Sequence, residues 1–235
     1  MTSAGNQPLL AVCGLCGGAG ASTLAYLVAQ AAAHAGDEPV LVCDSGGPTG
    51  GLAGYAAAES SRSLPSLANA IAAHEPLAAG LFADAGPRLR VLATRPRLDA
   101  DVDPDGLARL LHDAREAHAL TVVDCGVPSC GVDEQVLEDA THVVWVLPAT
   151  VGAVRRCERT LALFHPHESR REIVVARHDP AGRKAPIPQL TDLAAGRNAP
   201  LVLMPDVPDL AEQPQHEALE AVQLSLDALL MAVRR

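Results

Sequence analysis

A single α/β domain over residues 1–235, with a doubly wound, mostly parallel sheet and helices on both faces, is the fold that the sequence predicts. Strand-like and helix-like segments alternate along the chain, as in successive right-handed βαβ crossovers. Several strand-like segments are continuous apolar runs, which is expected when helices cover both faces of a parallel sheet. Neither an internal repeat nor a clear linker divides the chain.

The amino-terminal elements follow from short apolar runs that are separated by helix-forming segments. Residues 8–13 (PLLAVC) predict a strand that ends in glycines, and the alanine-rich residues 22–35 predict a helix. Residues 39–43 (PVLVC) predict the second strand, residues 64–74 a helix, and residues 88–94 (RLRVLAT) a further strand.

The middle of the chain continues the alternation. Residues 104–117 predict a helix, because leucines and an alanine recur there at helical spacing. The apolar runs 120–124 (LTVVD) and 142–147 (HVVWVL) predict strands. Residues 150–163 predict the helix that follows, and residues 172–176 (EIVVA) predict the next strand.

The carboxyl-terminal part adds a helix at 187–195, a strand at 200–204 and a closing helix at 217–233. The closing helix has apolar residues on one face, namely Leu219, Val222, Leu226, Leu229 and Val233. Its other face is acidic, whereas helices that lie on membranes are rich in Lys and Arg there. We therefore expect it to pack on the domain, with peripheral membrane contact as the alternative. No apolar stretch of about 18 residues predicts a membrane span.

The chain has a net charge of −10, and this acidity argues against non-specific DNA binding. All of the net charge lies within residues 1–150. The segment from Arg155 to Arg197 is locally basic, and a solvated face is expected there, with a partner or nucleic-acid patch as the alternative. No signal peptide is visible, and six cysteines, mostly in apolar segments, indicate reduced thiols in a cytoplasmic protein.

A glycine-dense turn, GLCGGAGAST over residues 14–23, lies between the first strand and the first helix. Glycines let the backbone curl so that its N–H groups point inward, and the helix dipole adds positive potential. A strand, a glycine turn and a helix in this order predict a site for phosphate or another anion.

This turn resembles the phosphate loop of the MinD/ParA family of P-loop ATPases. Its matching residues are Gly17, Gly18, Gly20, Ser22 and Thr23. The resemblance implies that the loop binds ATP or ADP and that the Ser22 hydroxyl binds Mg²⁺. Two family lysines are replaced: Ala21 stands where one contacts the β- and γ-phosphates, and Cys16 where the other reaches the partner of a dimer. Loss of one such charge typically costs about 10²–10³ in rate.

Two aspartates at strand ends extend the resemblance. Asp44 matches the first aspartate of the family's Asp-x-Asp switch, whose second position is Gly46 here, and Asp124 matches the Mg²⁺-linked carboxylate of a Walker B strand. A simpler alternative is that both aspartates only cap turns. Their joint position at the carboxyl ends of parallel strands favours a ligand site.

Weaker parts of the resemblance concern the family branch and the base. Gly50-Gly51-Leu52 resembles the TadZ/CpaE branch, and Arg177 and Pro205 match positions that hold the adenine in family members. Cys13 and Cys16 raise the alternative of a metal or iron–sulfur site, but free structural thiols are the default for buried cysteines.

The sequence leaves three functions open. The preferred hypothesis is a catalytically silent or impaired MinD/ParA-like protein that places pilus, secretion or septum-site machinery through protein contacts, with weak or absent ATP/ADP and Mg²⁺ binding. A homodimer would have to use a face other than the usual nucleotide sandwich. The second hypothesis is a slow or partner-activated ATPase, in which an arginine supplies the missing charge. The third is a ParA-like DNA partitioning factor.

Overall fold

The protein has the predicted doubly wound architecture. The computed structural model describes residues 7–45, 51–57, 59–76, 81–93, 101–129, 131–167, 169–179, 184–206 and 215–234. Its sheet has eight strands in the order β3-β4-β2-β5-β1-β6-β7-β8. They are β1 (Leu9–Gly14), β2 (Val40–Asp44), β3 (Ala83–Gly86), β4 (Leu89–Leu92), β5 (Leu120–Gly126), β6 (His142–Pro148), β7 (Arg171–His178) and β8 (Leu201–Pro205). Every pairing is parallel except that of β3 with β4.

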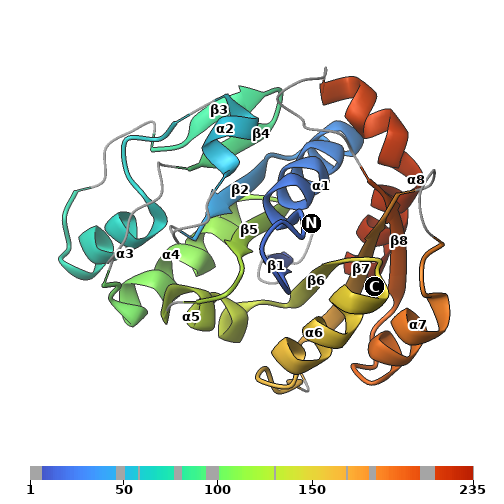
Figure 1. Cartoon of the computed structure of the whole chain (residues 1–235). Coiled ribbons are helices and arrows are strands. Elements are labelled where there is room, and N and C mark those ends of the chain that lie inside the picture. Colours follow the sequence, from blue (N-terminus) through green and yellow to red (C-terminus); the bar gives the residue numbers. More distant parts are fainter. Residues whose placement is uncertain are drawn as a thin grey trace.

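Helices cover both faces of this sheet (Figure 1). They are α1 (Ala21–Ala35), α2 (Leu52–Ala56), α3 (Leu64–Ala72), α4 (Pro104–Ala117), α5 (Gly131–Asp139), α6 (Val151–Leu161), α7 (Ile187–Ala195) and α8 (Gln215–Val233). One apolar cluster joins α1, α2 and α8 to one face of the sheet. The other cluster joins helices α3, α4, α5, α6 and α7 to the opposite face. The two clusters form the core on either side of the strands.

The central strand β1 shows why these runs form a buried sheet. All its residues are buried between β5 and β6. Leu10 and Val12 pack toward α1 and α8, whereas Leu9, Ala11 and Cys13 pack toward the other helical layer. Side chains alternate across a strand, so a continuous apolar run satisfies both layers at once.

The helix starts differ in how their backbone N–H groups are satisfied. Ser63 caps α3, Asp103 caps α4 and Thr150 caps α6, each through a side-chain oxygen that accepts a backbone hydrogen bond. Helix α1 begins after Gly20, which provides no side-chain cap. Its first N–H groups are therefore left for water or a ligand.

The closing helix α8 packs on the domain, as expected from its acidic polar face. Val222, Leu226, Leu229 and Val233 are buried and belong to the cluster that contains α1. No helix in the described residues is long and apolar enough to cross a membrane.

Several element boundaries differ from the sequence-based prediction. The helix predicted over 64–74 ends at Ala72, and His74 adopts a left-handed φ of 54° that a helix cannot contain. The strand predicted over 88–94 begins only at Leu89, because Arg88 is a turn residue with φ 65°. Helix α6 ends two residues early, at Leu161. Elements α2, β3 and α5 were not predicted; they are short and lack a long apolar run.

Candidate functional site: a phosphate-type loop

The turn between β1 and α1 is held at the carboxyl edge of the sheet by the strand next to it. The Leu15 N–H donates to the Val146 carbonyl at 2.9 Å, and the buried Leu15 side chain anchors the turn. Within the turn, the Ala19 N–H donates to the Cys16 carbonyl at 3.2 Å. Gly18 and Gly20 have φ of 71° and 93°, a left-handed region that favours glycine. The glycines are thus required by the curl of the loop.

A pocket of about 280 Å³ lies over this loop. The predicted residues that line it together are Gly17, Gly18, Gly20, Ala21, Ser22, Thr23 and Arg177. Gly51, Tyr55 and Gly126 close its sides. The pocket has room for a phosphate group or a short polyphosphate.

Asp124 lies beside Ser22, the residue with which the resemblance pairs it for Mg²⁺. Asp124 is 1% exposed, and burial raises the pKa of its carboxyl group to about 6, although hydrogen bonds from Ser22 and from the Gly126 N–H oppose the shift. The Gly126 N–H donates to Oδ1 at 3.0 Å. Oδ2 is buried and has no hydrogen-bond partner of good geometry in the described part of the chain. A buried carboxylate oxygen left over beside a serine hydroxyl fits the oxygen donors that Mg²⁺ takes from P-loop proteins.

The second aspartate, Asp44, ends β2 directly opposite Asp124 in the sheet register. It is 4% exposed, and the Ser45 N–H donates to the Asp124 carbonyl at 3.0 Å. Asp124 also accepts a hydrogen bond from the Gly126 N–H, so the turn-capping alternative explains part of its role. Gly46 and Gly50 lie outside the described residues.

Ala21, which the resemblance places at the lysine position, is the first residue of α1 and is 6% exposed. Among the described residues that line the pocket, Arg177 alone is charged. The chain's single lysine, Lys184, is exposed and does not line this pocket.

Arg177 contacts the loop itself. Its Nη2 donates to the Gly18 carbonyl at 2.9 Å, and its Nε pairs with the Asp206 carboxylate at 3.2 Å. The resemblance placed Arg177 and Pro205 at an adenine, and both line a neighbouring cavity of only about 10 Å³, the volume of about one water molecule. The contact between Arg177 and the loop was missed by sequence reasoning. An arginine at the end of a parallel strand near β1 was the only signal for it.

The five described cysteines are free thiols. Cys13 contacts Cys125 and Cys16 contacts Cys157, whose burial raises its pKa to about 12. No group of three or more His, Cys, Asp or Glu side chains that could hold a metal ion occurs among the residues that the structure describes. Cys130 lies outside those residues.

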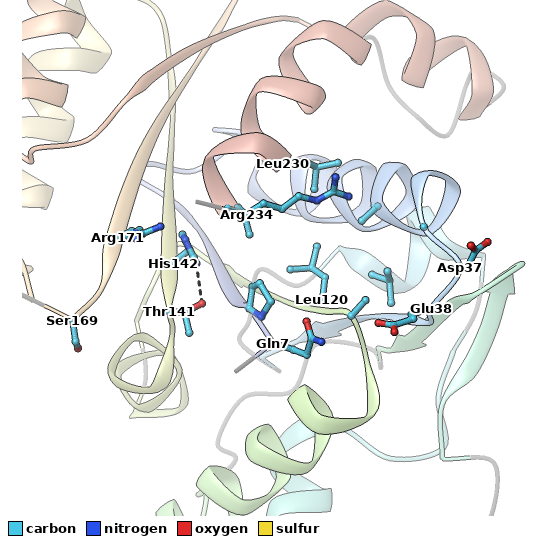
Figure 2. A pocket seen from close by; sticks show the side chains of 16 residues that line it. Gln7, Asp37, Glu38, Leu120, Thr141, His142, Ser169, Arg171, Leu230 and Arg234 are labelled. Atoms are coloured by element: carbon cyan, nitrogen blue, oxygen red, sulfur yellow. Dashed lines mark hydrogen bonds between the residues drawn. The ribbon is translucent and has the colours of Figure 1, made fainter. Parts of the chain in front are cut away.

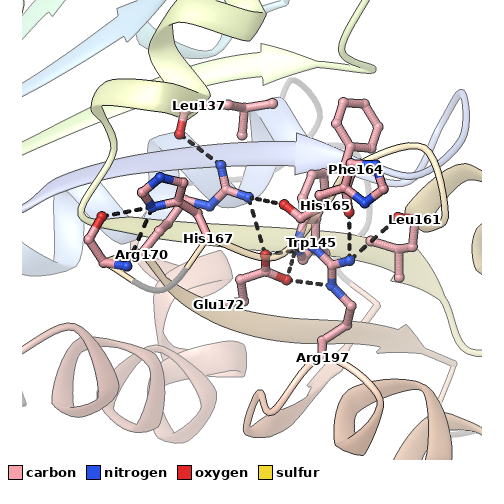
Figure 3. Close-up of polar contacts among 10 residues, drawn as sticks. Leu137, Trp145, Leu161, Phe164, His165, His167, Arg170, Glu172 and Arg197 are labelled. Atoms are coloured by element: carbon pink, nitrogen blue, oxygen red, sulfur yellow. Dashed lines mark hydrogen bonds and ion pairs between the residues drawn. The ribbon is translucent and has the colours of Figure 1, made fainter.

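The basic segment from Arg155 to Arg197 does not form one solvated face, because two of its arginines are buried in an ion-pair cluster. Figure 3 shows the polar contacts of that cluster. Arg170 and Arg197 have side chains only 9% exposed, and both pair with the buried Glu172 carboxylate. Trp145 donates its indole N–H to the same carboxylate at 2.9 Å. Part of the apparent basic patch is therefore structural.

A second hollow, of about 900 Å³, lies at the amino ends of the strands, opposite the loop (Figure 2). Thr141, His142 and Arg171 lie on one side of it, and Asp37 and Glu38 on the other. Burial and the nearby Arg171 lower the pKa of His142. Sequence reasoning did not indicate this hollow, and no motif marks it.

Solved structures with the same fold were found by comparison. A ParA family ATPase from Chlorobium tepidum TLS has a TM-score of 0.75 at 19% identity, covering 95% of this chain and 98% of that one. The MinC:MinD cell division complex of Aquifex aeolicus gives 0.71 at 16%, covering 97% and 94%. The septum site-determining protein MinD of Pyrococcus horikoshii OT3, complexed with Mg-ADP, gives 0.73 at 11%, covering 97% and 95%.

No protein-family model matches the sequence, and no curated protein matches it. At these identities the solved structures establish the MinD/ParA-type P-loop fold and leave function to be argued from the site.

Proposed function

We propose that this protein is a MinD/ParA-like P-loop protein with impaired catalysis, which acts as a localisation or assembly factor of the pilus, secretion or septum-site type. It resembles the TadZ/CpaE branch in this view. It binds ATP or ADP with Mg²⁺ weakly and works mainly through contacts with other proteins. A reduced, cytoplasmic location fits its six cysteines, which lie mostly in apolar segments.

The observation that carries the proposal is the uncharged start of α1. Ala21 fills the lysine position with a buried methyl group, and the loop around it contains no Lys or Arg. Phosphoryl transfer depends on fixed positive charge around the γ-phosphate. A loop of this shape without that charge supports binding more readily than turnover.

Protein contacts are proposed as the output because a protein of the same fold has been found in complex with another protein. The MinD of Aquifex aeolicus forms a complex with MinC. A homodimer of the present chain is part of the proposal, through a face that does not require the lysine that Cys16 replaces.

Calorimetry tests the binding part directly. The full chain is titrated with ATP and ADP, each with and without Mg²⁺, and phosphate release is followed in parallel. We expect binding that Mg²⁺ strengthens and no release above the blank. Ser22→Ala should remove the strengthening by Mg²⁺, whereas the exposed control Ser61→Ala should keep it. Rapid release of phosphate from the purified chain would refute the proposal.

A slow ATPase is the second candidate, because Arg177 brings one positive charge to the loop. Hydrolysis that is abolished by Asp124→Ala would favour it over the first. A DNA partitioning role is the third candidate. It predicts retention on DNA that falls steeply with salt. The burial of Arg170 and Arg197 weighs against it.

A further inference from the structure

The guanidinium of Arg177 is seated on the phosphate loop, although the residue comes from β7, far away in the sequence. Nη2 binds the Gly18 carbonyl at 2.9 Å and so lies against the middle of the loop. The side chain is 26% exposed, which leaves part of the guanidinium accessible from the pocket. Arg177 lines both the pocket over the loop and the small cavity beside it.

Arg177 also lies close to Gly20, the residue that precedes α1. A Cβ added at Gly20 would lie 2.6 Å from Arg177 Nη1, closer than real side chains approach. Gly20 also precedes the first turn of α1 with a left-handed φ of 93°. The guanidinium therefore brings a positive charge close to the uncapped amino end of α1, which is where a phosphate would bind.

The same guanidinium is held by a carboxylate. Asp206 Oδ1 lies 3.2 Å from Arg177 Nε, and the Asp206 side chain is 49% exposed. An exposed ion pair contributes little to stability, so another anion can readily take the place of its carboxylate. A phosphate oxygen offers arginine the same planar, two-point contact as a carboxylate does, with more negative charge. Asp206 and a bound phosphate would thus compete for one cation.

We propose that Arg177 supplies the positive charge for a polyphosphate group bound at the loop, in place of the lysines that the loop lacks, and that Asp206 restrains it. The ligand class is a di- or triphosphate, either free or as part of a nucleotide. This inference rests on the proposed nucleotide binding and changes one part of it. Arg177 serves the phosphates, whereas the family resemblance assigned it to the adenine.

The test compares inorganic pyrophosphate with Mg-ADP by calorimetry on the full chain. Arg177→Gln should weaken both ligands by about 10- to 100-fold, the usual worth of a charge-assisted hydrogen bond. Arg177→Lys should recover part of the loss, since it keeps the charge but not the planar contact. Asp206→Asn should strengthen both ligands several-fold. The control Arg171→Gln removes the same charge at the other end of β7 and should change neither.

The outcomes separate this inference from the proposed function. A loss in Arg177→Gln that is confined to Mg-ADP means that the residue serves the base, and overturns the inference. Equal or tighter binding in Arg177→Gln overturns it as well. If the wild type binds neither ligand but Asp206→Asn binds both, the inference stands, and the proposal that the wild type binds nucleotide weakly is refuted. If neither protein binds, both fail. Melting curves for each variant show that it is folded, and Asp206→Asn tests for a gain that misfolding cannot mimic.

Discussion

Glu172 holds two arginines inside the protein, and replacing it with glutamine removes its charge at nearly constant volume. Its carboxylate accepts from Arg197 at 2.6 and 2.7 Å, from Arg170 at 3.3 Å and from the Trp145 indole at 2.9 Å. The side chains of Glu172, Arg170 and Arg197 are 3%, 9% and 9% exposed. The variant would bury two guanidinium groups with no opposing charge.

The size of the effect follows from this burial. Breaking a buried ion pair by removing one partner costs about 3–5 kcal/mol. The glutamine side chain of the variant would still offer one amide oxygen, and the guanidinium groups keep carbonyl partners such as Phe164 and Leu137. We therefore expect Glu172→Gln to lower the free energy of unfolding by about 3 kcal/mol, the lower end of this range. For a chain of this length that lowers Tm by about 6–12 °C.

Urea unfolding measures the loss, and the chain carries its own probe. Trp145 is the only tryptophan and contacts Glu172 directly, so its fluorescence reports on this site, and the far-ultraviolet circular dichroism follows the helices and strands in parallel. Glu134→Gln, on the exposed side of α5, is the matched control and should stay within about 0.5 kcal/mol of the wild type. A loss below about 1 kcal/mol for Glu172→Gln would show that water replaces the carboxylate and that the burial argument is wrong.

The remaining predictions concern charge, pH and thiol access. Ala21→Lys should tighten ATP binding by about tenfold or more in calorimetry, because it adds a charge-assisted bond at the start of α1; unchanged affinity would mean that the loop does not hold the phosphates. Burial lowers the pKa of His118, and the nearby Arg90 lowers it further, so its unfolded state takes up a proton first as pH falls. The stability contributed by the neutral His118 imidazole is thus fully present above about pH 6.5 and is lost as pH falls through the lower folded pKa. In urea titrations, the His118→Gln variant should therefore lose less stability than the wild type between pH 7.5 and 5.5. Equal losses would contradict this cause. In a Cys130→Ser background, mass spectrometry of the native protein should find Cys16 alkylated first, since it is the only partly exposed thiol among the described cysteines; labelling of the others at the same rate would contradict their burial.

The sheet could be predicted from the sequence because its strands carry their own signal. The apolar runs that form β1, β5 and β6 are continuous, and the structure confirms them to within two residues. Strand β3 has the sequence ADAG, which carries no apolar pattern. It forms because β4 offers an open antiparallel edge, a tertiary effect that no local window contains.

The site could be predicted only in part, for a related reason. The glycine turn and the two strand-end aspartates lie in short segments whose positions follow from chain order alone. The contact between Arg177 and the loop depends on the direction in which the Arg177 side chain leaves β7, and β7 lies far from the loop in the sequence. The burial of Arg170 and Arg197 likewise depends on where Glu172 points, and composition suggested a solvated face instead.

The position of β1 also sets when the loop can exist during synthesis. Leu9 pairs with Thr121, and Leu10 with His142, so both neighbours of this first strand are made late. A nascent chain that has left the ribosome with its glycine turn complete still lacks β5, β6 and the carbonyl of Val146 that holds Leu15. Such distant pairings close slowly, since the intervening chain must first be ordered. Fragments that stop before His142, and so lack all of β6, should therefore bind no phosphate, however intact their loop sequence is.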